Sequence, residues 1–243
     1  MTDKGSVVAI IPARGGSKRI PKKNVRPFAG RPMISYPIRA ALDAGLFDKV
    51  IVSTDSEEIA EVARAQGADV PFLRPAELSD DRTATAPVLV HALAWLEAEG
   101  TPADYACCVY ATAPFVRSSD LVEGLDILKA AKATTAFSVT TYAFPIFRSL
   151  KITDAGTLSM FWPEHRLTRS QDLPEAYHDA GQFYWMDVKR FIADPNLYSA
   201  DARPVVLPRY LVQDIDTPED WAMAEHMYQA LQIRTRSVAD KHK

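Results

Sequence analysis

The sequence predicts a doubly wound α/β fold with a mostly parallel central sheet. Short apolar runs of strand length alternate with longer segments of helical periodicity up to about residue 141, and this alternation is typical of parallel strands joined by helices. The first run, residues 7–11, is continuously apolar, as in a strand that is buried on both faces. Residues 142–175 instead carry prolines, aromatic residues and a turn signal at 154–156, which predicts a β-rich excursion from the sheet.

The other elements follow from apolar periodicity and from the Gly, Pro and capping residues between the runs. We expect further strands at residues 50–53, 70–73, 105–110, 136–140, 182–186, 205–207 and 211–212. We expect helices at residues 32–44, 56–65, 85–96, 118–131 and 217–231. The last helix has the clearest start, with Thr217 at the cap, Pro218 next and two acids in the first turn. The elements form one domain over residues 1–233, and a flexible polar tail is expected over 234–243.

Composition narrows the possible partners and the compartment. The 243 residues carry a formal net charge of −3, which argues against a nucleic-acid partner. The two cysteines, Cys107 and Cys108, are neighbours in an apolar run, where a disulfide between them is geometrically unfavourable and free buried thiols are expected. No run approaches the ~20 apolar residues of a membrane span, and the start of the chain lacks the apolar stretch of a signal peptide. We therefore expect a cytoplasmic protein without a membrane partner.

A basic, glycine-containing loop follows the first predicted strand. No Asp or Glu occurs from residue 4 to residue 42, whereas this stretch contains Arg14, Lys18, Arg19, Lys22, Lys23, Arg26, Arg31 and Arg39. Ligands of open α/β sheets bind beyond the carboxyl ends of strands. There Gly15 and Gly16 let backbone N–H groups approach a ligand, Arg14 can hold two phosphate oxygens and Lys23 adds a point charge. The loop therefore predicts a triphosphate site, with a solvated basic turn as the structural alternative. It matches neither a Walker A loop nor a dinucleotide fingerprint.

A pair of carboxylates precedes the last predicted helix. Asp214 and Asp216 are two positions apart, so on an extended segment both side chains face the same way. Two carboxylates suit Mg²⁺, which takes oxygen ligands and shares them with phosphates. The alternative is that Asp214 caps a turn and Asp216 caps the helix. Together with the basic loop, the pair predicts a Mg²⁺ site.

Residues 177–185 are rich in aromatic and polar side chains. An aromatic wall with a few fixed polar groups is typical of a sugar site. The alternative is an ordinary core strand, in which Phe183 and Trp185 alternate inward. His178 is either a general base or a hydrogen-bonded structural residue.

Several motifs resemble the CMP-N-acetylneuraminic acid synthetase (acylneuraminate cytidylyltransferase) family. They lie at residues 11–18 with 21–24, 52–55, 73–78 and 214–216, in the same order as in that family, and the likeness spans residues 7–231. Within the family, residues 110–115 and 169–185 are most similar to pseudaminic acid cytidylyltransferases. One departure is Tyr110, which stands where the N-acetylneuraminate enzymes carry Gln.

The resemblance implies an activity, a fold and a partner. It implies a Rossmann-like nucleotidyltransferase that joins CMP from CTP to an acidic nine-carbon sugar, with release of pyrophosphate and dependence on Mg²⁺. It implies a homodimer in which the excursion at 142–175 packs against the other subunit. Tyr110 favours pseudaminic acid over N-acetylneuraminic acid, because the tail of pseudaminic acid is less polar.

The resemblance also implies residue roles. Arg14, Lys23, Asp214 and Asp216 would be catalytic, and the two aspartates would hold the metal. The nucleotide would contact Arg14, Gly15, Gly16, Ser17, Lys18 and Lys23 through its triphosphate, and Asn24, Arg74 and Thr85 through its base and ribose. The sugar would contact Tyr110, His178, Gln182 and Phe183.

Three alternatives remain open at this point. The same reaction could use N-acetylneuraminic or legionaminic acid as the acceptor. A glycosyltransferase could use the two aspartates as its metal motif, and a non-catalytic nucleotide-binding module could keep the fold without the chemistry.

Overall fold

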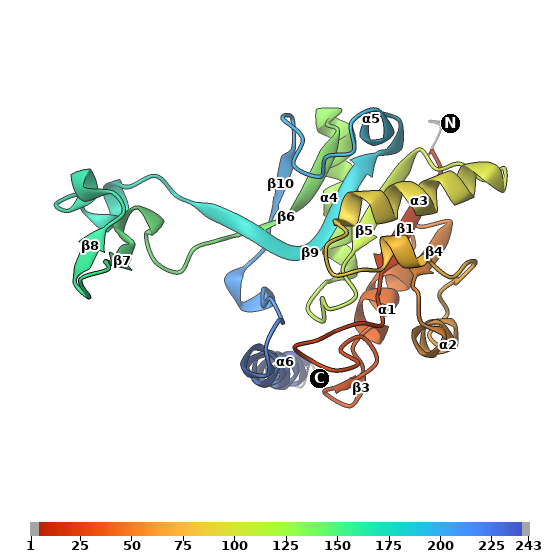
Figure 1. Cartoon of the computed structure of the whole chain (residues 1–243), viewed down its shortest axis with the longest axis horizontal. Coiled ribbons are helices and arrows are strands. Elements are labelled where there is room, and N and C mark those ends of the chain that lie inside the picture. The colour runs from red at the N-terminus through yellow and green to blue at the C-terminus, as the bar shows by residue number, and fades with distance from the viewer. Residues whose placement is uncertain (1–4, 240–243) are drawn as a thin grey trace.

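The computed structural model describes the backbone of residues 5–239 and the side chains of residues 5–233. Its central sheet has six strands in the order β10-β6-β9-β5-β1-β4 (Figure 1). Their bounds are β1 Val7–Pro12, β4 Lys49–Ser53, β5 Tyr105–Val109, β6 Thr135–Thr141, β9 Tyr177–Asp187 and β10 Arg203–Val206. All neighbours pair in parallel except β9, which runs antiparallel to both β5 and β6. The mostly parallel sheet is therefore confirmed.

Helices cover both faces of the sheet, as expected for a doubly wound fold. Successive residues of β1 explain why: Val7, Ala9 and Ile11 enter one core cluster, whereas Val8 and Ile10 enter the other. A strand between two helical layers must be apolar on both faces, which gives the continuous apolar run. One face is covered by α1 Ser35–Ala44, α2 Glu57–Ala65 and α4 Ser118–Ala131, and the other by α3 Thr85–Ala98 and α5 Val188–Ala193.

A third core cluster joins the two ends of the described chain. The loop after β1 contains the short antiparallel pair β2 Pro27–Phe28 and β3 Arg31–Pro32, and the C-terminal helix α6 Pro218–Ala239 packs against it. Phe28 is fully buried there and meets Trp221 edge-on at 5.5 Å between ring centroids. This packing holds the segment before α6 beside the loop that follows β1.

The expected β-rich excursion projects from the sheet between β6 and β9 (Figure 1). Its strands β7 Leu150–Ile152 and β8 Leu158–Met160 form an antiparallel hairpin, and Gly156 takes a left-handed conformation (φ 74°) in the turn. Short 3₁₀ helices flank the hairpin at η2 Ile146–Arg148, η3 Pro163–His165 and η4 Ser170–Asp172. Several large apolar side chains of this arm are exposed, namely Phe144, Leu150, Ile152, Leu158, Phe161 and Leu167.

Two predicted strands are wrong. Residues 70–73 form no strand: isolated bridges join Asp69 to Ile51 of β4 and Leu73 to Thr54, directly after β4. Pro71 lies between these bridges and has no N–H to extend a ladder. The expected strand at 211–212 is replaced by the 3₁₀ helix η5 Arg209–Leu211, which begins directly after Pro208.

Two helix boundaries also differ from the prediction. Helix α1 begins at Ser35 rather than at Pro32, because Pro32 pairs with Pro27 in the β2–β3 hairpin. Helix α6 continues past Leu231 to Ala239, so part of the segment expected as a polar tail is helical, and residues 240–243 lie outside the described residues. A 3₁₀ turn, η1 Ala76–Leu78, lies between Arg74 and α3. Among the helices of residues 5–239, none combines the length and apolar character needed to cross a membrane.

Candidate active site

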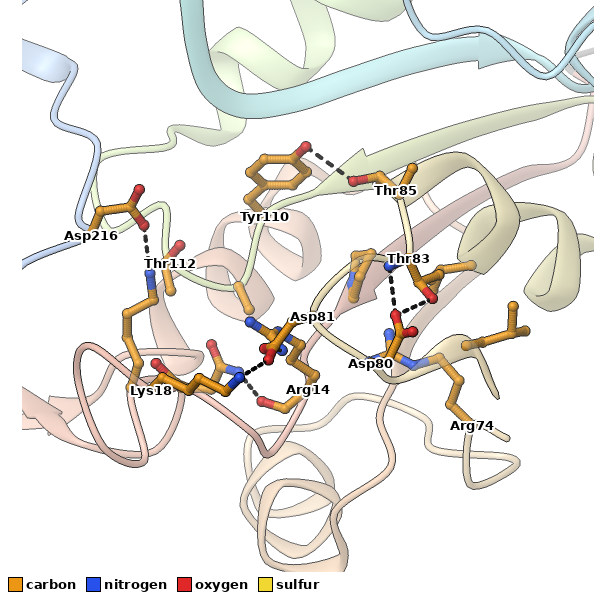
Figure 2. Close-up of a pocket in the computed structure, with 18 of the residues that line it drawn as sticks. Arg14, Lys18, Arg74, Asp80, Asp81, Thr83, Thr85, Tyr110, Thr112 and Asp216 are labelled. Atoms are coloured by element: carbon orange, nitrogen blue, oxygen red, sulfur yellow. Dashed lines mark hydrogen bonds and ion pairs between the residues drawn. The ribbon is translucent and has the colours of Figure 1, made fainter. Parts of the chain in front are cut away.

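A cleft of about 660 Å³ opens at the carboxyl ends of β1 and β5 (Figure 2). It brings together side chains from the loop after β1, the segment before α3, the end of β5 and the segment before α6. The expected site residues that line it are Arg14, Ser17, Lys18, Lys23, Asn24, Arg74, Thr85, Tyr110 and Asp216. Gly15, Gly16, Asp214, His178, Gln182 and Phe183 are not among its lining residues.

The basic loop is held in place by polar contacts. Asn24 is buried and donates its amide N–H to the carbonyl oxygen of Arg14 at 2.9 Å. The N–H of Gly15 donates to Asp55 Oδ1 at 2.8 Å. A Cβ atom at Gly15 would lie only 3.1 Å from the Cβ of Ser56, the N-cap residue of α2. Glycine is therefore needed at this position because the loop passes close to the start of α2. The loop is therefore fixed to the end of β4, with its cations turned toward the cleft.

Two carboxylates on opposite sides of the cleft pair with the cations of the loop. Asp81 pairs with both Arg14 and Lys18 (Figure 2), and these partners lower its pKa to about 2. Asp216 lies 2.8 Å from Arg19 Nη2 and 3.4 Å from Lys23 Nζ. Neither Asp81 nor Arg19 is among the site residues expected from the sequence. The only signal for Asp81 was a pair of acids directly before a predicted helix, which is also an ordinary capping pattern.

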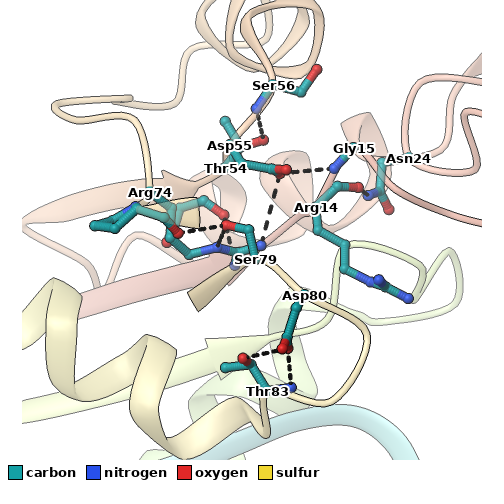
Figure 3. A network of polar contacts seen from close by, with 12 residues as sticks. Arg14, Gly15, Asn24, Thr54, Asp55, Ser56, Arg74, Ser79, Asp80 and Thr83 are labelled. Carbon is teal, nitrogen blue, oxygen red and sulfur yellow. Dashed lines mark hydrogen bonds and ion pairs between the residues drawn. The ribbon is translucent and has the colours of Figure 1, made fainter. Parts of the chain in front are cut away.

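Arg74 is buried at one end of the cleft and is held from several sides (Figure 3). Its Nε donates to Ser79 Oγ at 3.0 Å and its Nη1 to the Ser53 carbonyl at 3.4 Å. Its Nη2 lies 3.9 Å from Asp55 Oδ1, the same oxygen that accepts from Gly15. Burial lowers the pKa of Arg74, and the charge of Asp55 opposes that shift. Asp55 therefore links the basic loop to a guanidinium that is rigidly oriented.

The side chain of Asp80 stabilises the loop between Arg74 and α3 through hydrogen bonds to Thr83. Its Oδ1 accepts from the N–H and the hydroxyl of Thr83, both at 2.6 Å (Figure 3). These hydrogen bonds lower the pKa of Asp80. Two residues later Thr85 begins α3, and its Oγ1 lies 3.2 Å from the hydroxyl of Tyr110, at the end of β5. Thr85 and Tyr110 form the wall of the cleft opposite the basic loop (Figure 2).

Asp214 and Asp216 fit a divalent cation. Partial desolvation of its carboxyl and the negative charge of Asp216 raise the pKa of Asp214, so a cation bound between the two carboxylates would relieve their repulsion. Among the described residues no third His, Cys, Asp or Glu joins them in a cluster, yet Mg²⁺ commonly binds one or two carboxylates together with substrate phosphates.

The capping alternative for Asp216 is not supported by its contacts. Asp220 Oδ2 accepts from the N–H of Thr217 at 2.8 Å, and Thr217 Oγ1 accepts from the N–H of Asp220 at 3.2 Å. Thr217 and Asp220 thus cap the start of α6 reciprocally. The side chain of Asp216 is left facing Arg19 and Lys23.

Three of the expected sugar residues lie outside the cleft. Phe183 is completely buried in the core, where a Cβ on Gly124 of α4 would meet its ring at 3.1 Å. Gln182 is buried and donates its amide N–H to the Leu211 carbonyl, which braces the segment that leads to Asp214. His178 Nδ1 lies 2.8 Å from the Asp179 carbonyl, and its ring contacts Tyr142 at the base of the arm. The structure thus gives Phe183 and Gln182 packing roles.

The fold and the cleft define a nucleotidyltransferase, and the family comparison agrees. The model of the cytidylyltransferase family matches residues 8–234. The chain belongs to this family.

Individual relatives place the chain more narrowly within the family. A pseudaminic acid cytidylyltransferase of Campylobacter jejuni is 41% identical, over 91% of this chain and 95% of the relative. A CMP-N,N'-diacetyllegionaminic acid synthase of Legionella pneumophila is 32% identical, over 91% of this chain and 95% of the relative. An N-acylneuraminate cytidylyltransferase of Escherichia coli is 29% identical, over 90% of this chain and 51% of the relative. These matches confirm the resemblance found in the sequence motifs.

Solved structures confirm the fold. A CMP:2-keto-3-deoxy-manno-octonic acid synthetase, solved in complex with CTP, superposes with a TM-score of 0.66 at 18% identity and covers 93% of this chain and 99% of its own. A 4-diphosphocytidyl-2C-methyl-D-erythritol synthase from Anaerococcus prevotii superposes with a TM-score of 0.63 at 15% identity, covering 93% of this chain and all of its own.

Proposed function

We propose that the protein joins CMP from CTP to pseudaminic acid and releases pyrophosphate. The observation that carries this proposal is the contact between Lys23 and Asp216 across the cleft. It sets the cations suited to a triphosphate beside the carboxylates suited to its metal ion. The likeness to pseudaminic acid cytidylyltransferases supports the choice of sugar.

In the proposed reaction, the anomeric hydroxyl of the sugar attacks the α-phosphorus of CTP. The bond between the α-phosphorus and the bridging oxygen breaks, the hydroxyl gives up its proton to solvent water, and pyrophosphate leaves. Arg14 and Lys18 hold the phosphates that leave, and Lys23 neutralises the charge that develops during transfer. Such positioning and neutralisation supply most of the catalysis in phosphoryl transfer.

We assign the metal to Asp214 and Asp216. When bound, Mg²⁺ supplies positive charge to the phosphate oxygens and makes a neighbouring hydroxyl more acidic.

We assign cytosine and its ribose to Asn24, Arg74 and Thr85, which all line the cleft. The guanidinium of Arg74 is fixed by Ser79 and Ser53, so it can discriminate between hydrogen-bonding patterns without losing side-chain entropy on binding. A site built to hydrogen-bond one group can reject an analogue that lacks it by about 10⁴. CTP should therefore be strongly preferred over UTP, ATP and GTP.

A pyrophosphate-release assay tests the proposal directly. Each of the four nucleoside triphosphates is supplied with Mg²⁺ and with pseudaminic, legionaminic or N-acetylneuraminic acid, and the CMP-sugar is measured in parallel. We expect release only with CTP and an acceptor sugar. Binding of CTP without pyrophosphate release would indicate a nucleotide-binding module, and transfer from a preformed nucleotide sugar would indicate a glycosyltransferase.

The choice of pseudaminic acid depends on Tyr110. The phenol presents a largely apolar wall, and a polar substituent placed against such a wall without a partner costs about 1–3 kcal/mol. That range corresponds to roughly a tenfold to hundredfold preference for the sugar with the less polar tail. Legionaminic acid is the second candidate, because its synthase is also a full-length relative. A higher kcat/KM with N-acetylneuraminic acid would overturn the sugar assignment while leaving the cytidylyltransferase proposal intact.

We also propose that a second copy of the chain covers the arm. Exposed contiguous apolar surface on a projecting segment marks interaction sites, and Ile152 and Leu158 lie opposite each other in the exposed β7–β8 hairpin. Light scattering after gel filtration should give a dimer for the native chain and a monomer for Ile152→Asp. Ile233→Asp, which changes a similarly exposed residue on α6, is the control and should stay dimeric.

The expected cytoplasmic location stays a prediction, compatible with the two free buried cysteines.

A further inference from the structure

The carboxylate of Asp179 collects three hydrogen-bond donors beside the active-site cleft. Its Oδ2 accepts from the hydroxyls of Tyr184 and Tyr198, each at 2.6 Å. Its Oδ1 accepts from the N–H of Gly181 at 2.8 Å. Gly181 has a left-handed backbone (φ 62°), and the pairing of β9 with β6 shifts register here. The hydrogen bonds of Asp179 therefore stabilise a bulge in β9.

Contacts lead from this carboxylate to the cleft in three steps. Tyr184 donates to Asp179, and its ring packs against the ring of Tyr110 with 5.2 Å between centroids. The hydroxyl of Tyr110 lies 3.2 Å from Thr85 Oγ1. Tyr110 and Thr85 both line the cleft, whereas Asp179 and Tyr184 stand behind them.

The hydrogen bond to Asp179 determines where the proton of the Tyr184 hydroxyl points. A carboxylate only accepts hydrogen bonds, so the single proton of each phenol points at Asp179. Burial, the neighbouring Tyr110 and the charge of Asp179 all raise the pKa of Tyr184, which keeps this phenol protonated. Its oxygen therefore presents only lone pairs toward Tyr110.

We propose that Asp179 is a positioning residue for the sugar side of the active site, acting through Tyr184 to hold Tyr110 at the cleft wall. This inference rests on the proposed role of Tyr110 in sugar recognition. Tyr184 is only 2% exposed, so without Asp179 its buried hydroxyl would lose the carboxylate that accepts its proton, and the phenols of Tyr110 and Tyr198 would remain as its partners. The hydroxyl would then turn toward these phenols, and the ring of Tyr110 packed on Tyr184 would lose its fixed support.

The two phenols on Asp179 form a matched pair for a test. Tyr184→Phe and Tyr198→Phe each remove one hydrogen bond of the same length to the same carboxylate oxygen. Only Tyr184 packs against Tyr110, whereas Tyr198 is largely exposed and contacts Phe137. A role confined to stabilising the bulge predicts similar effects of the two substitutions, and a positioning role predicts different effects.

The experiment measures KM for the sugar and for CTP, and the melting temperature, on the full chain with the nonulosonic acid that it uses best. We expect Tyr184→Phe and Asp179→Asn to raise the sugar KM by about tenfold, with the KM for CTP unchanged. Tyr198→Phe should leave both KM values unchanged. If Tyr184→Phe lowers the melting temperature as Tyr198→Phe does and leaves the sugar KM alone, the positioning role is overturned. Tyr184→Phe removes one oxygen atom only, so it remains informative if Asp179→Asn fails to fold.

Tyr110→Ala, which removes the ring that forms the wall, separates this inference from the function on which it rests. A raised sugar KM in Tyr110→Ala together with a normal one in Tyr184→Phe would reject the positioning role and keep the sugar role of Tyr110. A normal sugar KM in Tyr110→Ala would reject both, while the cytidylyltransferase reaction itself would be judged by pyrophosphate release in the native enzyme.

Discussion

The Nζ atom of Lys23 lies 3.4 Å from Oδ1 of Asp216, a residue 193 positions further along the chain. The same ammonium group donates to the Ile215 carbonyl at 2.5 Å. Lys23 belongs to the loop after β1 and Asp216 to the segment before α6, so the site forms only when the beginning and the end of the domain pack together. The cluster around Phe28 and Trp221 holds them there.

Asp216→Asn should remove most of the activity and keep the fold. A neutral amide holds Mg²⁺ poorly, and losing a stabilisation of several kcal/mol corresponds to a rate drop of roughly 10²-fold or more. The measurement is kcat as a function of Mg²⁺ concentration, with Glu219→Gln on the exposed first turn of α6 as the control. Near-normal rates with an unchanged Mg²⁺ dependence would remove Asp216 from the metal site.

Asp214→Asn should stabilise the protein while inactivating it. Burial and Asp216 raise the pKa of Asp214 in the folded state, so its contribution to stability is complete below the unfolded pKa and is lost as the pH rises through the folded value. In the absence of metal, the variant should melt higher than the native protein at pH 7.5, and the difference should shrink as the pH falls and vanish below the unfolded pKa of about 3.9. Equal melting temperatures at both pH values would show that the two carboxylates do not interact.

Arg14→Ala should raise the KM for CTP and lower turnover, and Arg14→Lys should restore only part of the loss. A lysine supplies a point charge but cannot hold two phosphate oxygens in a planar fork. Arg39→Lys is the matched control, because Arg39 is an exposed arginine on α1 that pairs with Asp43 outside the cleft. Native kinetics in both Arg14 variants would reduce the loop to a solvated basic turn.

Asp81→Asn should lower the KM for CTP. Arg14 and Lys18 pair with Asp81, so nucleotide phosphates must compete with this carboxylate for the same cations. The pKa of Asp81 is about 2, so its charge is constant above mild acid and the gain should not depend on pH between about 5 and 8. Asp43→Asn, which breaks a surface pair away from the site, should have no effect. An unchanged or higher KM in Asp81→Asn would show that Asp81 does not compete with the nucleotide.

Gly124→Ala should destabilise the protein although alanine favours helices. A Cβ at this position of α4 would lie 2.6 Å from Trp185 Cδ1, and Trp185 is fully buried. Overpacking of a core costs about 1–3 kcal/mol, against a gain of about 1 kcal/mol in helix propensity. The net cost of up to about 2 kcal/mol corresponds to a fall of up to roughly 8 °C in melting temperature for a chain of this size. Glu123→Ala, on the exposed side of the same helix, should leave it nearly unchanged.

The sheet was largely predictable because its strands are short apolar runs punctuated by loop residues. The place of β9 was not: an apolar segment reveals burial, but not which neighbours it pairs with or in which direction. The error at 70–73 has a similar origin, since Val70 is buried in the same core cluster as Val50 and Val52 of β4 and yet only its neighbours Asp69 and Leu73 form isolated bridges. Burial and strand pairing leave the same signature in a sequence.

The site was predictable where it is local. Arg14, Lys18 and Lys23 lie on one loop directly after a strand, so their convergence follows from their spacing. Asp81 was missed because its partnership with Arg14 depends on where a separate loop folds back, which no local pattern records. Phe183 was placed in the sugar site because aromatic residues line both sugar sites and cores. Only the register of β9, which turns Phe183 toward Gly124 of α4, distinguishes the two.

The place of β9 in the middle of the sheet also dictates the order in which the chain can fold during synthesis. Strands β4, β1 and β5 can assemble once Val109 has left the ribosome, but the free edge of β5 is covered only by residues 183–187. An uncovered edge offers unpaired N–H and C=O groups to other chains. A nascent or truncated chain that stops within the arm therefore exposes an apolar strand edge, so chaperone dependence and aggregation should be greatest for products that end between residues 110 and 182.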